Sequence, residues 1–269
     1  MRYTKQDIID QLNMMGAPRN SAVIVHSSLR SVGEIEGGAQ ALLDALIEHF
    51  TAEGGLLCIP THTWDNLGKP EKFTLDLATP ENCLGALSTL AASDARGTRT
   101  ENPTHSLVVF GDKDRVRDFI ADETEIKTPT APESCYGKIC RTGGHVLLIG
   151  VSQARNTSLH AVAEILNLPD RMDTAERDVT VKRIDGEVVS RKLTLYDCSF
   201  TNDISQRFIK YETAFRYHRC TVDGFVGDAP TQLCDAMGMM ETVKLIWERM
   251  GGEDPLASEY PIQPKWYCR

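Results

Sequence analysis

The 269-residue sequence contains no run that approaches the roughly 18 consecutive apolar residues expected of a membrane-spanning helix. We therefore expect no membrane as a partner. The segment from Met1 to Asp7 also lacks the apolar centre of a secretory signal peptide. Together these two absences predict a cytoplasmic protein.

Several motifs that define common classes of site are also missing. There is no GxGxxG loop and no GxxxxGK loop followed by Ser or Thr, so nucleotide binding through such loops is not supported. The absence of a GxSxG elbow weakens an α/β-hydrolase interpretation. The eight cysteines are scattered and form no CxxC pair, which argues against a zinc site of the usual spacing. We expect no metal cofactor and no disulfide framework.

Basic residues are fewer than acidic ones: the sequence has 29 Lys and Arg residues and 38 Asp and Glu residues, which gives a formal net charge of -9. No basic stripe is present, which argues against nucleic acid as a partner. An acidic surface attracts cationic substrates, although charge alone favours the simpler explanation that the acidic surface only aids solubility.

Short apolar runs alternate with helical patterns as far as about residue 170. This order is typical of an α/β fold with a parallel sheet and helices on both faces. Asp185-Gly186 lies between two strand-like runs and predicts a late antiparallel hairpin, which would make the sheet mixed. We therefore expect a mixed, largely parallel central sheet within one domain spanning residues 1–269. The predicted buried strands are Ala22–Val25, Leu56–Ile59, Leu107–Phe110 and Val146–Ile149. Later helices are predicted over about Asp203–Tyr217 and Thr231–Met250.

Polar clusters lie at the ends of these predicted strands: His26–Ser28, Thr61–Thr63, Asn102–Ser106 and Asn156–His160. Ligands of open α/β sheets bind where the carboxyl ends of parallel strands meet. Hydroxyl groups and helix N-termini there suit an anion, or a carbonyl that becomes an oxyanion. His160 falls on the first turn of a predicted helix. It is either an inert polar residue or a general base that acts near neutral pH.

Four motifs occur in register along the chain. Val25–Gly33 with Gly37-Gly38 and Gly55–Thr61, and then Asn102–Ser106, resemble the N-terminal signature and the His-Pro-x-His-Ser segment of the aminoglycoside 3-N-acetyltransferase family. Leu148–Val151 followed by Asn156–His160 matches its most distinctive motif, and Gly224–Ala229 resembles its C-terminal element. The resemblance covers nearly the whole chain in the family's order.

The resemblance implies transfer of an acetyl group from acetyl-CoA to an amine of a cationic acceptor such as an aminoglycoside. It also implies that His160 acts on that amine. By the same resemblance, CoA lies along Ser27, Ser28, Leu29, Arg30, Ser31, Val32 and Gly33, with His105 and Ser106 nearby. Asn102 stands where the family often has His, and we assign it no catalytic task.

A mechanistic hypothesis follows, with His160 as the base and a carboxylate that stabilises its imidazolium. Glu212 is the first candidate for this carboxylate, because the family places an acidic partner in that later region. Glu164 is the second. The family usually has Glu three residues after the motif His, where this chain has Ala163. Thr157 or a backbone N–H would hold the thioester oxyanion.

The acceptor pocket is predicted to include Trp64, Asp65 and Asn66, although a folded loop lid explains these residues equally well. Two alternatives stay open. One is a CoA-binding family member that acts on a non-antibiotic amine. The other is a hydrolase that uses Ser27 or Ser28 with a histidine. Whether the protein forms a homodimer is also open.

Overall fold

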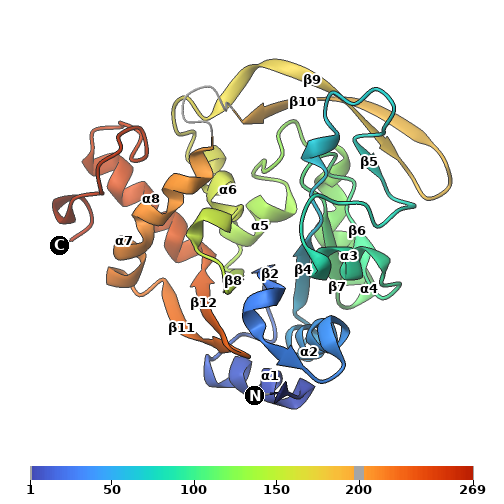
Figure 1. The fold of residues 1–269 in the computed structure, drawn as a ribbon. Helices are drawn as coiled ribbons and strands as arrows, with labels where there is room; N and C mark the ends of the chain where they lie inside the picture. Colours follow the sequence, from blue (N-terminus) through green and yellow to red (C-terminus); the bar gives the residue numbers. More distant parts are fainter. Residues whose placement is uncertain (1, 197–202, 269) are drawn as a thin grey trace.

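A seven-stranded sheet forms the centre of the computed structural model, which describes residues 2–196 and 203–268 (Figure 1). In spatial order the strands are β11 (Thr221–Val226), β12 (Ala229–Asp235), β8 (His145–Ile149), β2 (Ala22–Ser27), β4 (Leu56–Pro60), β7 (Leu107–Phe110) and β6 (Thr98–Arg99).

The sheet is mixed, as predicted, but its parallel part is confined to β8, β2 and β4. The pairs β4–β7, β7–β6, β8–β12 and β12–β11 are antiparallel. The predicted strand Leu107–Phe110 is therefore present but runs against its neighbour β4. It pairs with β6, which comes just before it in the chain, and such a hairpin needs no crossover helix to set its direction.

Helices cover both faces of the sheet, as predicted. Successive residues of β2 alternate between two apolar clusters: Val23 and Val25 belong to one, and Ile24 to the other. Because both faces are buried, the central strands read as continuous apolar runs. The first cluster includes α1 (Lys5–Met14), α2 (Gly38–Thr51) and α3 (Ala86–Ser93). The second includes α4 (Lys113–Ile120), α5 (Cys135–Arg141), α6 (Ser158–Ile165), α7 (Glu212–Tyr217) and α8 (Ala236–Arg249).

The predicted hairpin exists, but the expectation that it extends the central sheet is wrong. β9 (Met172–Lys182) and β10 (Val188–Tyr196) form a separate three-stranded sheet with β5 (Leu75–Asp76). The hairpin crosses above the main body (Figure 1). Glu101 attaches the hairpin to the main body through ion pairs with Arg183 and Arg191, at 2.9 and 2.8 Å. The antiparallel strands of the central sheet come from other segments.

Two predicted helices differ from the structure. The segment from Thr231 belongs to β12, and α8 begins only at Ala236 because Asp235 caps it by accepting a hydrogen bond from the Met237 N–H. The segment after Asp203 is a 3₁₀ helix, η5 (Ile204–Tyr211), which continues into α7. Helix α5, capped by Ser134, was not predicted.

The remaining elements are short. β1 (Arg2–Tyr3) pairs in parallel with β3 (Glu34–Ile35). The other 3₁₀ helices are η1 (Leu29–Val32), η2 (Trp64–Asn66), η3 (Ala121–Thr124), η4 (Gln153–Arg155) and η6 (Pro264–Trp266). Within the described part of the chain, no helix has both the length and the apolar character needed to cross a bilayer.

Candidate active site

Hydrogen bonds of buried side chains fix the loop between β8 and helix α6. Asn156 is buried: its Oδ1 accepts a hydrogen bond from the Ser158 N–H, and its Nδ2 donates to Gln153 Oε1 at 2.8 Å. Gly150 has a φ of +64°, and a Cβ there would lie 2.5 Å from the Cβ of Ser31. Glycine at this position therefore allows the loop after β8 to pass close to the loop after β2.

These loops border a cavity of about 730 Å³, which is within the range typical of small-molecule sites. It lies at the carboxyl ends of the three parallel strands β2, β4 and β8, where ligands of α/β sheets usually bind. The predicted site residues that line it are Ser27, Leu29, Trp64, His105, Thr157 and His160.

The other residues of the predicted CoA loop, Ser27–Gly33, do not line the cavity and contact the surrounding structure instead. Ser31 donates a hydrogen bond from its hydroxyl to Ser28 Oγ at 2.9 Å, and Val32 is fully buried in the core. Gly33 packs against Asp228, while Arg30 is exposed and does not line the cavity. Of the seven residues in this loop, only Ser27 and Leu29 face the site.

Three further predicted residues also lie outside the cavity lining. Ser106 is buried and donates its hydroxyl proton to the carbonyl of Thr61 at 2.7 Å. Asp65 forms a long ion pair with Lys69, at 3.9 Å, and Asn66 is buried in the η2 turn. The η2 turn thus presents only Trp64, which is 48% exposed, to the cavity.

Four of the seven histidines of the chain line this one cavity: His26, His62, His105 and His160. Burial lowers the pKa of His26 to about 4 and that of His105 to about 3. His62 shares a 2.7 Å hydrogen bond with the Tyr136 hydroxyl, and its ring centroid is 4.5 Å from that of His105. Packing of several imidazoles into a partly apolar cavity keeps them neutral at pH 7.

His160 is enclosed by aromatic rings. The Tyr196 ring stacks on it with centroids 4.1 Å apart and planes 19° apart, and Phe208 meets it edge-on at 4.9 Å. Burial lowers the pKa of His160 to about 3, and the charges of His105 and Arg171 act in the same direction. The Asp203 carboxylate opposes them by raising the His160 pKa.

Asp203 lines the same cavity as His160 and was not among the residues predicted from the sequence. Burial raises its pKa, but hydrogen bonds from Ser205 and Gln206 outweigh this effect and hold the pKa below its ordinary value. Asp203 is therefore ionised at pH 7 and is the carboxylate of this cavity that acts on His160. The sequence signal that could have identified it is its capping position just before the Ile204–Tyr211 helix.

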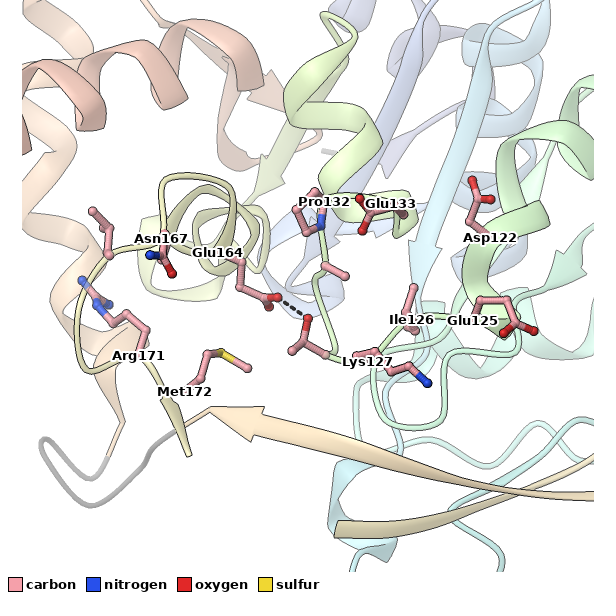
Figure 2. A pocket seen from close by; sticks show the side chains of 14 residues that line it. Asp122, Glu125, Ile126, Lys127, Pro132, Glu133, Glu164, Asn167, Arg171 and Met172 are labelled. Atoms are coloured by element: carbon pink, nitrogen blue, oxygen red, sulfur yellow. Dashed lines mark hydrogen bonds between the residues drawn. The ribbon is translucent and has the colours of Figure 1, made fainter. Parts of the chain in front are cut away.

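The two carboxylates predicted as partners of His160 do not line its cavity. Glu212 pairs with Arg216 at 2.8 Å on the exposed side of α7 and accepts a hydrogen bond from Gln232. Glu164 accepts hydrogen bonds from Thr128 and Thr130. It faces a second cavity of about 540 Å³. Figure 2 shows Glu164 reaching toward the loop that carries Lys127 and Pro132.

Two further residues of the loop between β8 and α6 supply polar groups to the cavity. Arg155 lines it and adds a permanent positive charge, a contribution that no sequence pattern predicts. Thr157 precedes α6, and within the described residues its side chain makes no capping hydrogen bond. Among residues 2–196 and 203–268, no group of three or more His, Cys, Asp or Glu side chains is arranged to bind a metal ion.

Comparison with known proteins confirms the resemblance seen in the motifs. Residues 24–247 match the family model described as "Aminoglycoside 3-N-acetyltransferase". This chain belongs to that family. The family match confirms the expectation of an N-acetyltransferase and supports acetyl-CoA as the acetyl donor.

Two curated relatives illustrate the relationship. Aminoglycoside N(3)-acetyltransferase IV of Salmonella sp is 27% identical over 262 residues, covering 96% of this chain and 91% of the relative. The SPbeta prophage-derived aminoglycoside N(3')-acetyltransferase-like protein YokD of Bacillus subtilis (strain 168) is 27% identical over 176 residues. That match covers 58% of this chain and 63% of YokD.

Solved structures share the fold. A histidine-to-alanine mutant of aminoglycoside acetyltransferase AAC(3)-IVa in complex with a gentamicin superposes with a TM-score of 0.77 and 25% identity, covering 100% of this chain and 95% of that chain. The binary complex of AAC-IIIb with CoASH also gives 0.77, at 20% identity, covering 95% and 99%. The mixed α/β architecture described above is therefore that of the aminoglycoside acetyltransferases.

Proposed function

We propose that this protein transfers the acetyl group of acetyl-CoA to an amino group of an aminoglycoside, with His160 as the general base. The observation that carries the proposal is the position of His160. The histidine of the family's most distinctive motif lines the cavity at the carboxyl ends of the parallel strands, beside an ionised carboxylate.

In this reaction the amine nitrogen attacks the thioester carbonyl carbon, and the bond from that carbon to the CoA sulfur breaks. His160 removes the proton from the attacking nitrogen, and the proton then neutralises the departing thiolate. Since burial keeps the imidazole neutral, His160 enters the reaction in the form that a base requires.

The burial that keeps His160 neutral also makes it a weaker base. Asp203 counteracts this effect, because a negative charge in a cavity of low polarity favours the imidazolium that forms during attack. We assign Asp203 this role in place of Glu212 and Glu164, which face other surroundings.

CoA occupies the side of the cavity formed by Ser27 and Leu29, and Arg155 pairs with one of its phosphates. The Thr157 hydroxyl, which lines the cavity at the start of α6, is assigned the role of donating to the thioester oxygen as that oxygen becomes negative. The acceptor enters past Trp64, whose partly exposed ring offers an apolar surface to a sugar.

The test is to mix the protein with acetyl-CoA and a panel of aminoglycosides and polyamines, and to follow the release of free thiol. Release that depends on an aminoglycoside is the expected result. Release only with a simpler amine would support the non-antibiotic alternative, and release without any amine would indicate a thioesterase. Among the described residues, neither Ser27 nor Ser28 makes a hydrogen bond to a histidine, so a serine hydrolase lacks its usual nucleophile–base pair.

Two further parts of the proposal concern the whole protein. We infer a cytoplasmic location, which is consistent with seven described cysteines that are all unpaired. Whether the protein forms a homodimer is tested by light scattering of the purified protein.

A further inference from the structure

The Tyr196 ring stacks on the His160 ring, with centroids 4.1 Å apart and planes 19° apart. Tyr196 is the last residue of β10, so the separate hairpin supplies this part of the cavity wall. We propose that Tyr196 is a positioning residue for His160, held in place by Thr130 and Glu164. This inference rests on the proposed role of His160 as the base.

The Tyr196 hydroxyl is anchored by a short chain of hydrogen bonds. It lies 2.5 Å from Thr130 Oγ1, which in turn lies 2.5 Å from Glu164 Oε1. The backbone N–H of Thr130 donates to the same carboxylate oxygen at 3.2 Å. A threonine hydroxyl has one proton. With Glu164 ionised, Thr130 therefore donates to the carboxylate and accepts from Tyr196.

The contacts that hold the His160 ring both start and finish on α6. They run from His160 through the stacked Tyr196 ring and Thr130 to Glu164. Glu164 follows His160 by one turn of α6, and its second oxygen accepts a hydrogen bond from Thr128, drawn as a dashed line in Figure 2. Glu164 thus faces the second cavity yet is connected, through Thr130 and Tyr196, to the face of the His160 ring. Any rotation of Tyr196 away from His160 breaks a hydrogen bond to a residue fixed relative to α6.

The arrangement holds the ring without transferring a proton to it. Burial, together with the charge of Glu164, raises the pKa of Tyr196 well above its ordinary value, so the phenol keeps its proton at neutral pH. A base that removes a proton through one ring nitrogen must keep that nitrogen directed at the incoming amine, and loss of this orientation lowers turnover more than binding.

The test compares Tyr196→Phe and Thr130→Val, each of which removes one hydroxyl from the chain. Each change is expected to lower kcat about three- to tenfold, the effect of the neutral Tyr196–Thr130 hydrogen bond that both changes remove, with KM for acetyl-CoA unchanged. The double variant should be no slower than the slower single variant, because both changes break the same chain. The matched control is Thr128→Val, which removes a hydroxyl from the same carboxylate but leaves the Tyr196–Thr130–Glu164 chain intact, so kcat stays within about twofold.

A second readout does not need an acceptor. The His160 ring signals are followed by NMR against pH, with assignment from a His160→Gln variant. Tyr196→Leu removes the stacked ring and admits water, so the His160 pKa should rise by at least about one unit toward its ordinary value. In Thr128→Val the titration should not move.

The proposal is overturned if Tyr196→Phe and Thr130→Val behave like Thr128→Val, if their effects on kcat multiply in the double variant, or if Tyr196→Leu leaves the His160 titration unchanged. Failure of the proposed function looks different: the unmodified protein then releases no thiol with any amine, while the NMR titrations still report on the chain. Circular dichroism confirms that each variant is folded.

Discussion

Glu164 follows His160 by one turn of α6, but the two side chains line different cavities. Residues four apart on a helix are neighbours, so a direct pair is the natural expectation. Here Thr128 and Thr130 capture the carboxylate instead. The negative charge that raises the His160 pKa comes from Asp203, which lines the same cavity but lies on a segment much later in the chain.

His160→Ala tests the central assignment. Loss of the proposed base is expected to lower kcat by a factor on the order of 10²–10⁴, with CoA affinity nearly unchanged, because in the proposed mechanism the imidazole acts on the amine. Steady-state thiol release measures the first quantity and calorimetry with CoA the second. Near-normal turnover would remove His160 from the mechanism.

Asp203→Asn removes the charge that opposes the low pKa of His160. We expect kcat to fall about tenfold or more, which corresponds to a loss of one pKa unit in the strength of the base. Glu212→Gln is the control, because Glu212 pairs with Arg216 outside the cavity. An equal fall in the control would reject the choice of Asp203.

Arg155→Ala tests the side of the cavity that receives CoA. Loss of a charged hydrogen bond to phosphate should raise the Kd for CoA about tenfold to a hundredfold, and binding should become less sensitive to salt. Arg30→Ala, an exposed residue outside the cavity lining, should change Kd little. The opposite ranking would mean that CoA runs along the outer side of the η1 turn.

Gly33→Ala tests the support of the CoA loop. Gly33 has φ +82° and ψ -160°, a region essentially restricted to glycine, and a Cβ there would clash with the Asp228 carboxylate. The strain should cost about 1–3 kcal/mol and lower Tm, and it should raise KM for acetyl-CoA by displacing the loop. In Gly143→Ala, where the added Cβ meets open space, only Tm should fall.

The buried histidines predict a loss of stability in acid. The pKa of His26 is lowered to about 4 in the folded protein, so between about pH 6.5 and 4 the unfolded chain binds a proton that the folded chain does not. Unfolding free energy should therefore fall as pH falls through this window, by up to about 1.4 kcal/mol per pH unit from His26 alone. His26→Gln should make the slope of denaturation midpoint against pH shallower. An unchanged slope would contradict the assignment.

The sequence predicts the centre of this molecule well, for a physical reason. Strands β2, β4 and β8 are buried on both faces, so their continuous apolar runs stand out from the helical patterns around them. Thr4 caps α1 and Asp112 caps α4, and such caps can be predicted from sequence because a capping interaction is local. The segment from Thr231 was misread because apolar residues of β12 continue directly into those of α8.

The site could be predicted only in part. Thr157 and His160 come from one contiguous motif, and their place at the carboxyl edge of the sheet follows from the strand before them. Tyr196 reaches the same cavity from the far end of the hairpin, and Asp203 reaches it from the segment that follows. No periodicity or spacing encodes that return, because the path depends on how the hairpin packs against the rest of the fold.

The β9–β10 hairpin has a consequence for the evolution of substrate preference. It belongs to its own small sheet and is attached to the body by β5 and by the Glu101 ion pairs, yet its end places Leu195 and Tyr196 in the lining of the candidate active site. Changes in its length, tilt or tip can therefore reshape the entrance for new acceptors while the seven-stranded scaffold and His160 on α6 are inherited intact.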